Sequence, residues 1–87
     1  MLKREHFTME HEKSVLEFGE KSKIVIDQIT YAGSAFASTE IGEKVYVKAS
    51  LVEDFDVFEG DICDATLILN FEDKRDRAQF RAIRLGN

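Results

Sequence analysis

Two short segments of alternating residues, 34–38 and 44–48, constrain the fold of this chain more than any other feature. The residues of one parity are all small or β-branched: Ala35, Ala37, Val45 and Val47. The other parity carries two large rings, Phe36 and Tyr46. A period of two predicts β-strands, whose successive side chains point to opposite faces. The short turn around Gly42 predicts that the strands pair as antiparallel neighbours, with the two rings within reach of each other.

Three arrangements of these faces are open. In the first, the small residues face the core and the rings lie exposed on the outer face. In the second, the N-terminal segment covers the rings. In the third, the register is inverted and the rings are in the core, but this would bury Lys44 and Lys48, which interiors rarely accept. We therefore predict the exposed arrangement.

Further period-two patterns predict three more strands, at 23–31, 61–70 and 77–85. The fourth strand should turn Cys63, Ala65, Leu67 and Leu69 inward. The apolar phase of the last strand shifts near Ala82 and Ile83, which predicts a bulge.

The connection 49–59 is longer than the others and reads as a helical turn. Its apolar side chains are expected to close an open end of a barrel: Leu51, Val52, Phe55 and Phe58. Five strands with a long connection after the third predict an all-β, five-stranded OB-fold, a Greek-key barrel; an SH3-like barrel is the main alternative.

The first 22 residues form an N-terminal extension, set apart from the barrel at 23–87. Phe7, His11, Val15 and Phe18 fall at helical spacing, with Thr8 as a candidate cap and Gly19 as a typical stop signal. A short amphipathic helix is one interpretation. An irregular extension, or a strand at 14–18, is the other.

Composition limits the functions open to the chain. Its 87 residues suffice for one small domain, and its net charge of −5 argues against broad, nonspecific phosphate binding. No apolar run approaches the roughly 20 residues of a membrane helix, and the N-terminus lacks the apolar core of a signal peptide. The single cysteine, Cys63, excludes an internal disulfide. We expect a cytoplasmic protein.

Three segments resemble a known family. Residues 33–38 (Gly-Ser-Ala-Phe-Ala-Ser), 45–50 (Val-Tyr-Val-Lys-Ala-Ser) and 59–62 (Glu-Gly-Asp-Ile) resemble a divergent cold-shock domain. They are similar as well to the cold-shock-like domains of ribonuclease II-type exonucleases. The resemblance implies an OB barrel that binds single-stranded RNA or DNA, with RNA favoured, through motifs on the second and third strands.

The resemblance transfers residue by residue. By it, Phe36 takes the place of the second phenylalanine of the first motif, and Tyr46 that of the first aromatic of the second motif. Lys48 stands where the family has histidine. Ser34 and Ala49 replace rings that the family carries, so only part of the stacking surface is retained.

The candidate binding residues follow from these motifs. Phe36 and Tyr46 would stack bases, each worth about 1–3 kcal/mol. The residues expected to assist them are Lys44 and Lys48 as flanking cations, Ser34 beside the rings, Tyr31 at the first turn as a replacement ring, and Lys74 and Arg75 in the last hairpin. That hairpin has an alternative interpretation as a charged, solvated loop.

No catalytic group is predicted, and no cofactor or metal. His6 and His11 do not share a helix face well. Asp54-x-Asp56 has Phe58 at the fifth position of a calcium loop, and its glycine is misplaced. The alternative function is a protein-interaction module. Segment 49–66 has six acids and no base, so its acidic part at 53–64 would bind a basic partner such as a polymerase or a ribosomal protein.

Overall fold

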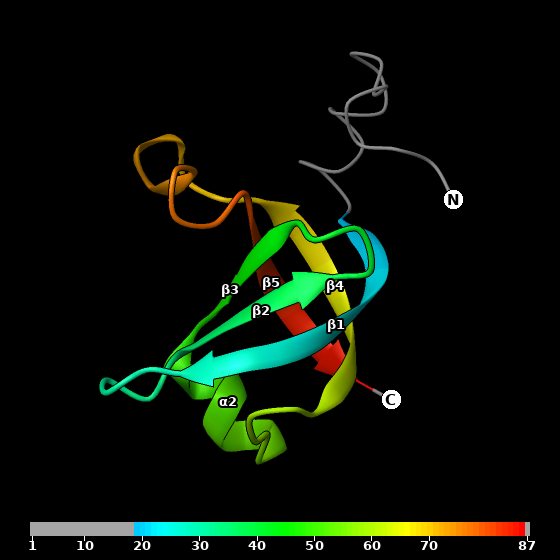
Figure 1. Cartoon of the computed structure of the whole chain (residues 1–87), viewed down its shortest axis with the longest axis vertical. Helices are drawn as coiled ribbons and strands as arrows, with labels where there is room; N and C mark the ends of the chain where they lie inside the picture. Colours follow the sequence, from blue (N-terminus) through cyan, green and yellow to red (C-terminus); the bar gives the residue numbers. More distant parts are fainter. Residues whose placement is uncertain (1–18, 87) are drawn as a thin grey trace.

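The computed structural model describes residues 19–86, and these form a closed barrel of five strands (Figure 1). The strands are β1 (Glu20–Ile29), β2 (Ala35–Thr39), β3 (Lys44–Val47), β4 (Ile62–Leu69) and β5 (Phe80–Gly86). Helix α2 (Ala49–Phe55) lies between β3 and β4, and the short 3-10 helix η2 (Glu72–Lys74) lies between β4 and β5. No helix in this part of the chain is long and apolar enough to cross a membrane.

The order of strands around the barrel is β1-β2-β3-β5-β4, and β4 pairs with β1 to close it. β3 and β5 run parallel, whereas every other pair is antiparallel. This is the predicted all-β, five-stranded OB-like barrel, with its helix after the third strand.

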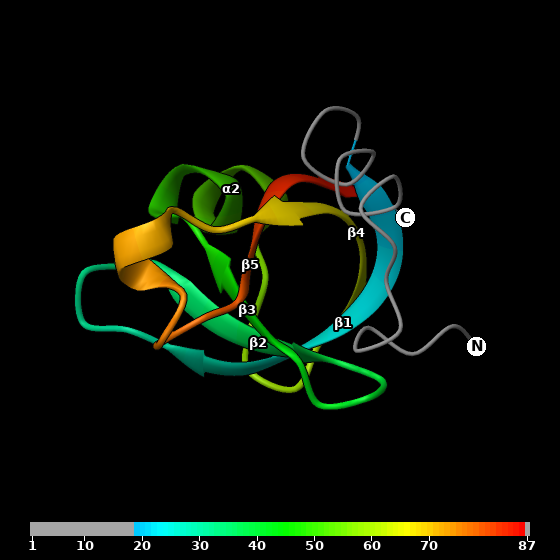
Figure 2. The same cartoon turned by 90° about the horizontal axis from the view of Figure 1, so that it is seen from above.

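β1 pairs with two strands, and this double pairing closes the barrel. Its first half pairs with β4 (Glu20 opposite Leu67), and its second half pairs with β2 (Ile29 opposite Ala35). An extra residue at Asp27 shifts the register and bends the strand. Figure 2 shows β1 curving round one side of the barrel. The strand begins at Glu20, ahead of the start predicted at residue 23, and the predicted helix or extension of the N-terminus otherwise falls outside the described residues.

The core confirms the predicted inward faces. Ala35, Ala37, Val45 and Val47 are completely buried, so the inverted register is wrong. On β5 the pairs Thr66–Arg84 and Leu67–Ala82 leave Ile83 without an opposite residue. This is the predicted bulge, and it turns Ile83 out of the core.

Helix α2 closes one end of the barrel, with a different set of side chains from the predicted one. Leu51 is buried and Val52 packs against the core, as predicted. Phe55 and Phe58 are exposed, so the prediction that they help to close the end of the barrel is wrong. The helix ends at Asp56 in a left-handed conformation (φ 51°), and the backbone N–H of Val57 then donates to the Val52 carbonyl. This turn places the Val57 side chain in the core.

Candidate nucleic-acid interface

Phe36 and Tyr46 lie directly opposite each other on β2 and β3, as predicted. Their ring centroids are 5.8 Å apart with an interplanar angle of 62°, an edge-to-face contact. Both side chains are half-buried and lie on the outer face. The alternative in which the N-terminal segment covers them concerns residues outside the described part.

The row of outward side chains continues onto β5, where Arg81 lies beside Tyr46 in the parallel pairing. The Arg81 guanidinium carbon is 4.5 Å from the centroid of the Phe71 ring, a cation–π contact. The Nε atom of Arg81 is buried and has no hydrogen-bond partner among the described residues. Phe71 and Arg81 were not predicted as site residues. Only the outward parity of Arg81, next to the core residue Phe80, hinted at its position.

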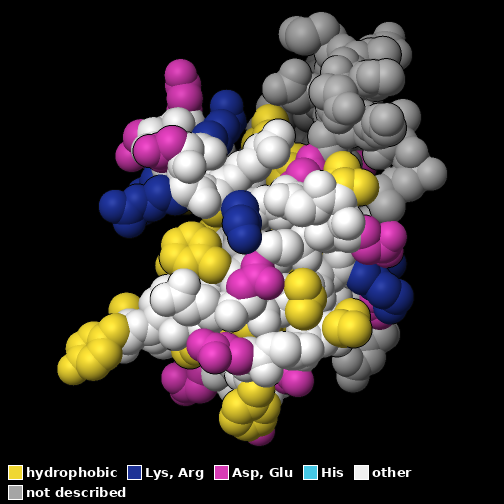
Figure 3. Space-filling view, viewed as in Figure 1, with side chains coloured by type: hydrophobic (Ala, Val, Ile, Leu, Met, Phe, Trp, Pro, Cys, Tyr) yellow, Lys and Arg dark blue, Asp and Glu magenta, His cyan; other side chains and the backbone are white. Residues whose placement is uncertain are grey.

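A groove of about 700 Å³ lies between this row and the loop that joins β4 to β5. Phe36, Tyr46 and Phe71 line it with aromatic rings. Its charged lining consists of four cations and two acids: Lys48, Lys74, Arg77, Arg81, Asp73 and Asp76. The groove is thus locally positive in a chain whose net charge is −5. In Figure 3, hydrophobic side chains and the Lys and Arg side chains of this loop lie next to one another at the left edge.

The loop is held in shape by Asn70, which is only 4% exposed. Its Nδ2 donates to the Ala78 carbonyl (3.0 Å), and its Oδ1 accepts from the Phe71 N–H (2.9 Å). Nε of Arg75 donates to the Asn70 carbonyl at 2.7 Å. Of the two predicted loop cations, Lys74 therefore lines the groove, while Arg75 braces the loop and does not line it.

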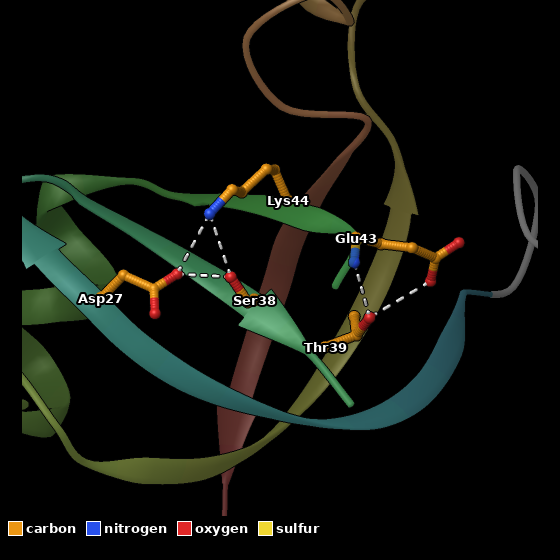
Figure 4. A network of polar contacts seen from close by, with 5 residues as sticks. All are labelled: Asp27, Ser38, Thr39, Glu43 and Lys44. Atoms are coloured by element: carbon orange, nitrogen blue, oxygen red, sulfur yellow. Dashed lines mark hydrogen bonds and ion pairs between the residues drawn. The ribbon is translucent and has the colours of Figure 1, made fainter. Parts of the chain in front are cut away.

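Lys44 lies outside the groove, at the opposite end of β3 from Lys48. Its Nζ is 3.3 Å from Ser38 Oγ and 3.7 Å from an Asp27 carboxylate oxygen (Figure 4). Next to it, the Glu43 N–H donates to Thr39 Oγ1 at 3.1 Å. These contacts tie β1, β2 and β3 together. Lys44 shares the outward face of β3 with Tyr46, two residues away, but its ammonium is directed to Ser38 and Asp27 and does not line the groove.

Ser34 and Tyr31 also differ from their predicted places. Ser34 is 7% exposed, and its hydroxyl lies 2.7 Å from the Thr30 hydroxyl. Its predicted position beside the rings is wrong, because β2 begins only at Ala35 and Ser34 belongs to the preceding turn. Tyr31 is fully exposed in this turn and does not line the groove.

Three acids of the segment 53–64 have structural partners. Glu59 accepts from the Ile29 N–H at 2.9 Å, and Asp61 accepts from the Phe58 N–H at 2.8 Å. Asp64 forms an ion pair with Lys23 at 2.8 Å, and this hydrogen bond and charge raise the pKa of the Lys23 ammonium. The other three acids, Glu53, Asp54 and Asp56, are exposed.

No group of three or more His, Cys, Asp or Glu residues within 19–86 is arranged to hold a metal ion. Cys63 is half-buried against the core. Burial raises the pKa of its thiol, and Asp61 and Asp64 add to the effect. A raised pKa keeps the thiol protonated and poorly nucleophilic, which fits the predicted packing role.

Comparisons with known proteins assign no relative to this chain. No family model matches the sequence, and no curated protein and no solved structure shows significant similarity to it. The barrel therefore rests on the structure alone, and the resemblance to cold-shock domains stays a hypothesis carried by its motifs.

Proposed function

We propose that this protein binds single-stranded nucleic acid, RNA in preference to DNA, in the groove between the β2–β3 face and the β4–β5 loop. The observation that carries the proposal is the continuous row Phe36–Tyr46–Arg81 across three strands. The Phe71 ring lengthens this row, because it packs against the Arg81 guanidinium. Rings interleaved with cations on an OB-type barrel are typical of single-strand binding. No catalytic step is part of the proposal.

The geometry of the rings supports stacking of unpaired bases. Because Phe36 and Tyr46 meet edge to face, they do not offer one flat surface, and a base would stack on one of them at a time. Arg81 covers one face of Phe71, which leaves the opposite face for a second base. Each stacked base contributes about 1–3 kcal/mol. The groove cations would contact phosphates on either side.

Two parts of the proposal rest on the sequence. The preference for RNA follows from the resemblance to cold-shock domains. The proposed cytoplasmic location is supported by the use of a single cysteine, Cys63.

The proposal is tested by titrating the full chain with short single-stranded RNA, single-stranded DNA and duplex RNA. The chain has no Trp and two Tyr residues, so a Tyr31→Phe background assigns the tyrosine fluorescence to Tyr46. We expect saturable quenching by the single strands, strongest for RNA, and none by the duplex. Tyr46→Ala and Phe71→Ala, followed by NMR, should each weaken binding about 5- to 150-fold, the equivalent of one lost stack.

The matched control is Phe58→Ala, which removes an exposed ring far from the groove lining. It should bind as the wild type does. Absence of saturation at low salt, or unchanged affinity in the Tyr46→Ala and Phe71→Ala double variant, would refute the proposal.

A further inference from the structure

The end of the barrel closed by α2 exposes three large hydrophobic side chains that the core does not use. Phe55 is 48% exposed, Phe58 63% and Ile62 73%. Phe55 and Ile62 line a shallow depression of about 160 Å³, together with Val57 and the half-buried Cys63. Neighbouring exposed hydrophobic residues with a depression between them are characteristic of an interaction site, unlike single scattered ones.

The backbone holds these side chains outward. Asp56 adopts φ 51°, a conformation that is unfavourable for a residue with a Cβ. The segment after it is tied to β1, because the Gly60 N–H donates to the Ile26 carbonyl at 2.7 Å and Glu59 accepts from the Ile29 N–H. A loop fixed in this way loses little entropy when a partner binds to it.

The segment that carries these side chains is negatively charged. Glu53, Asp54 and Asp56 are exposed beside them, and segment 49–66 contains no Lys or Arg. Figure 3 shows acidic side chains around a hydrophobic one at this end of the molecule, with no basic side chain next to them. Such a surface repels nucleic acid and anionic lipid and attracts cations.

We propose that this acidic, apolar end is a docking surface for a cationic segment of another protein. The segment would supply Lys or Arg residues opposite Glu53, Asp54 and Asp56, and a large apolar side chain that enters the depression between Phe55 and Ile62. Aromatic and aliphatic anchors in a small pocket carry most of the binding energy in such contacts, and charged rims guide the encounter.

A second copy of this chain is a less suitable occupant. Among residues 19–86, four cations gather at the groove, and a contact with them would be head-to-tail, would not close, and would produce open chains of molecules. It would also block the groove. No residue that lines the depression lines the groove, so the inference stands independently of nucleic-acid binding.

The test uses the full chain, labelled for NMR, and a synthetic peptide of about 15 residues that alternates Lys and Arg with Leu, so that an extended peptide presents cations on one face and Leu on the other. Two further peptides serve as probes: one with each Leu replaced by Ser, and one with each cation replaced by Glu. We expect saturable amide shifts confined to residues 53–63 with the first peptide and no saturation with the other two.

Phe55→Ser combined with Ile62→Ser, which changes two exposed residues that line the depression, should weaken binding of the first peptide at least tenfold. The control is Ile41→Ser, which removes another exposed hydrophobic residue, at the turn between β2 and β3, and should leave the affinity unchanged. All these positions are exposed, and amide spectra outside 53–63 verify that each variant is folded.

Four outcomes would overturn the inference: equal binding of the Ser peptide, shifts in the groove instead of at 53–63, unchanged affinity in the double variant, or self-association of the wild type that the double variant abolishes. Oligonucleotide titration of the same double variant separates the two proposals, since its affinity for RNA should equal that of the wild type.

Discussion

At the scale of single residues, Arg81 connects the two sides of the groove, which are the sheet face and the β4–β5 loop. Its guanidinium packs on Phe71, while its register neighbour Tyr46 belongs to the sheet. A buried donor without a partner, such as its Nε, costs about 1–3 kcal/mol. A phosphate or base oxygen bound in the groove would satisfy this donor. Under the proposed function, Arg81 would gain this hydrogen bond only when nucleic acid binds.

Replacing Arg81 should separate binding from stability. Arg81→Lys keeps the charge but loses the planar fork, so we expect weaker oligonucleotide binding, about 5- to 20-fold, from the loss of a charge-assisted contact. Arg81→Met keeps the apolar stem and should weaken binding further. It should leave the melting temperature unchanged or raise it, because the unpaired donor is gone. Titration and thermal unfolding of both variants check this, and full affinity in Arg81→Lys would contradict it.

At the scale of elements, the conformation of the β4–β5 loop depends on one buried side-chain amide, that of Asn70. Asn70→Ala removes the bonds to the Ala78 carbonyl and the Phe71 N–H. We expect a loss of about 1–3 kcal/mol in the free energy of unfolding, because these backbone groups lose their partner. Oligonucleotide affinity should fall as well, since Phe71 loses its fixed position.

Asn70→Asp is the matched variant. Its carboxylate still accepts from Phe71 but sets an acceptor and a buried charge against the Ala78 carbonyl, so at neutral pH its stability should be no higher than that of Asn70→Ala. Denaturant unfolding at constant slope measures both changes. If Asn70→Ala is as stable as the wild type, Asn70 does not hold the loop.

The same elements show what local sequence can predict. The alternation at Phe36 and Tyr46 predicted their strands, their pairing and their outward face, because a period of two is a local property. The bulge at Ile83 was also readable, as a break in that period. The place of Arg81 beside Tyr46 could not be predicted, because it depends on the parallel pairing of β3 with β5, two segments far apart in the chain. Ser34 was misplaced because a turn, and not the strand period, determines its burial.

At the scale of the whole described molecule, residues 19–86, the exposed acids Glu53, Asp54 and Asp56 and the β4–β5 loop lie at different ends of the barrel. The acids belong to the C-terminal end of α2, while Lys74 and Arg77 of the groove lie in the loop (Figures 1 and 3). A net charge of −5 would oppose nucleic acid if it were spread evenly. Screening extends over roughly 10 Å at 0.1 M salt, so at that ionic strength the groove acts largely through its own charges.

The salt dependence of binding should therefore be determined by the number of groove cations and not by the net charge of the chain. Contacts of single strands release about 0.7 counterion per phosphate neutralised. The four cations of the groove then set an upper limit of about 3 on the magnitude of the slope of log K against log salt concentration, and Asp73 and Asp76 lower it towards about 1. Lys74→Gln should reduce the magnitude by about 0.7.

Asp54→Asn with Asp56→Asn, far from the groove, should raise affinity only at low salt and leave it unchanged above about 0.15 M, where the Debye length is about 8 Å. A slope near zero with intact affinity would mean that stacking alone holds the strand. An effect of the Asp54 and Asp56 variant that persists at high salt would mean that the acidic end contacts the nucleic acid directly.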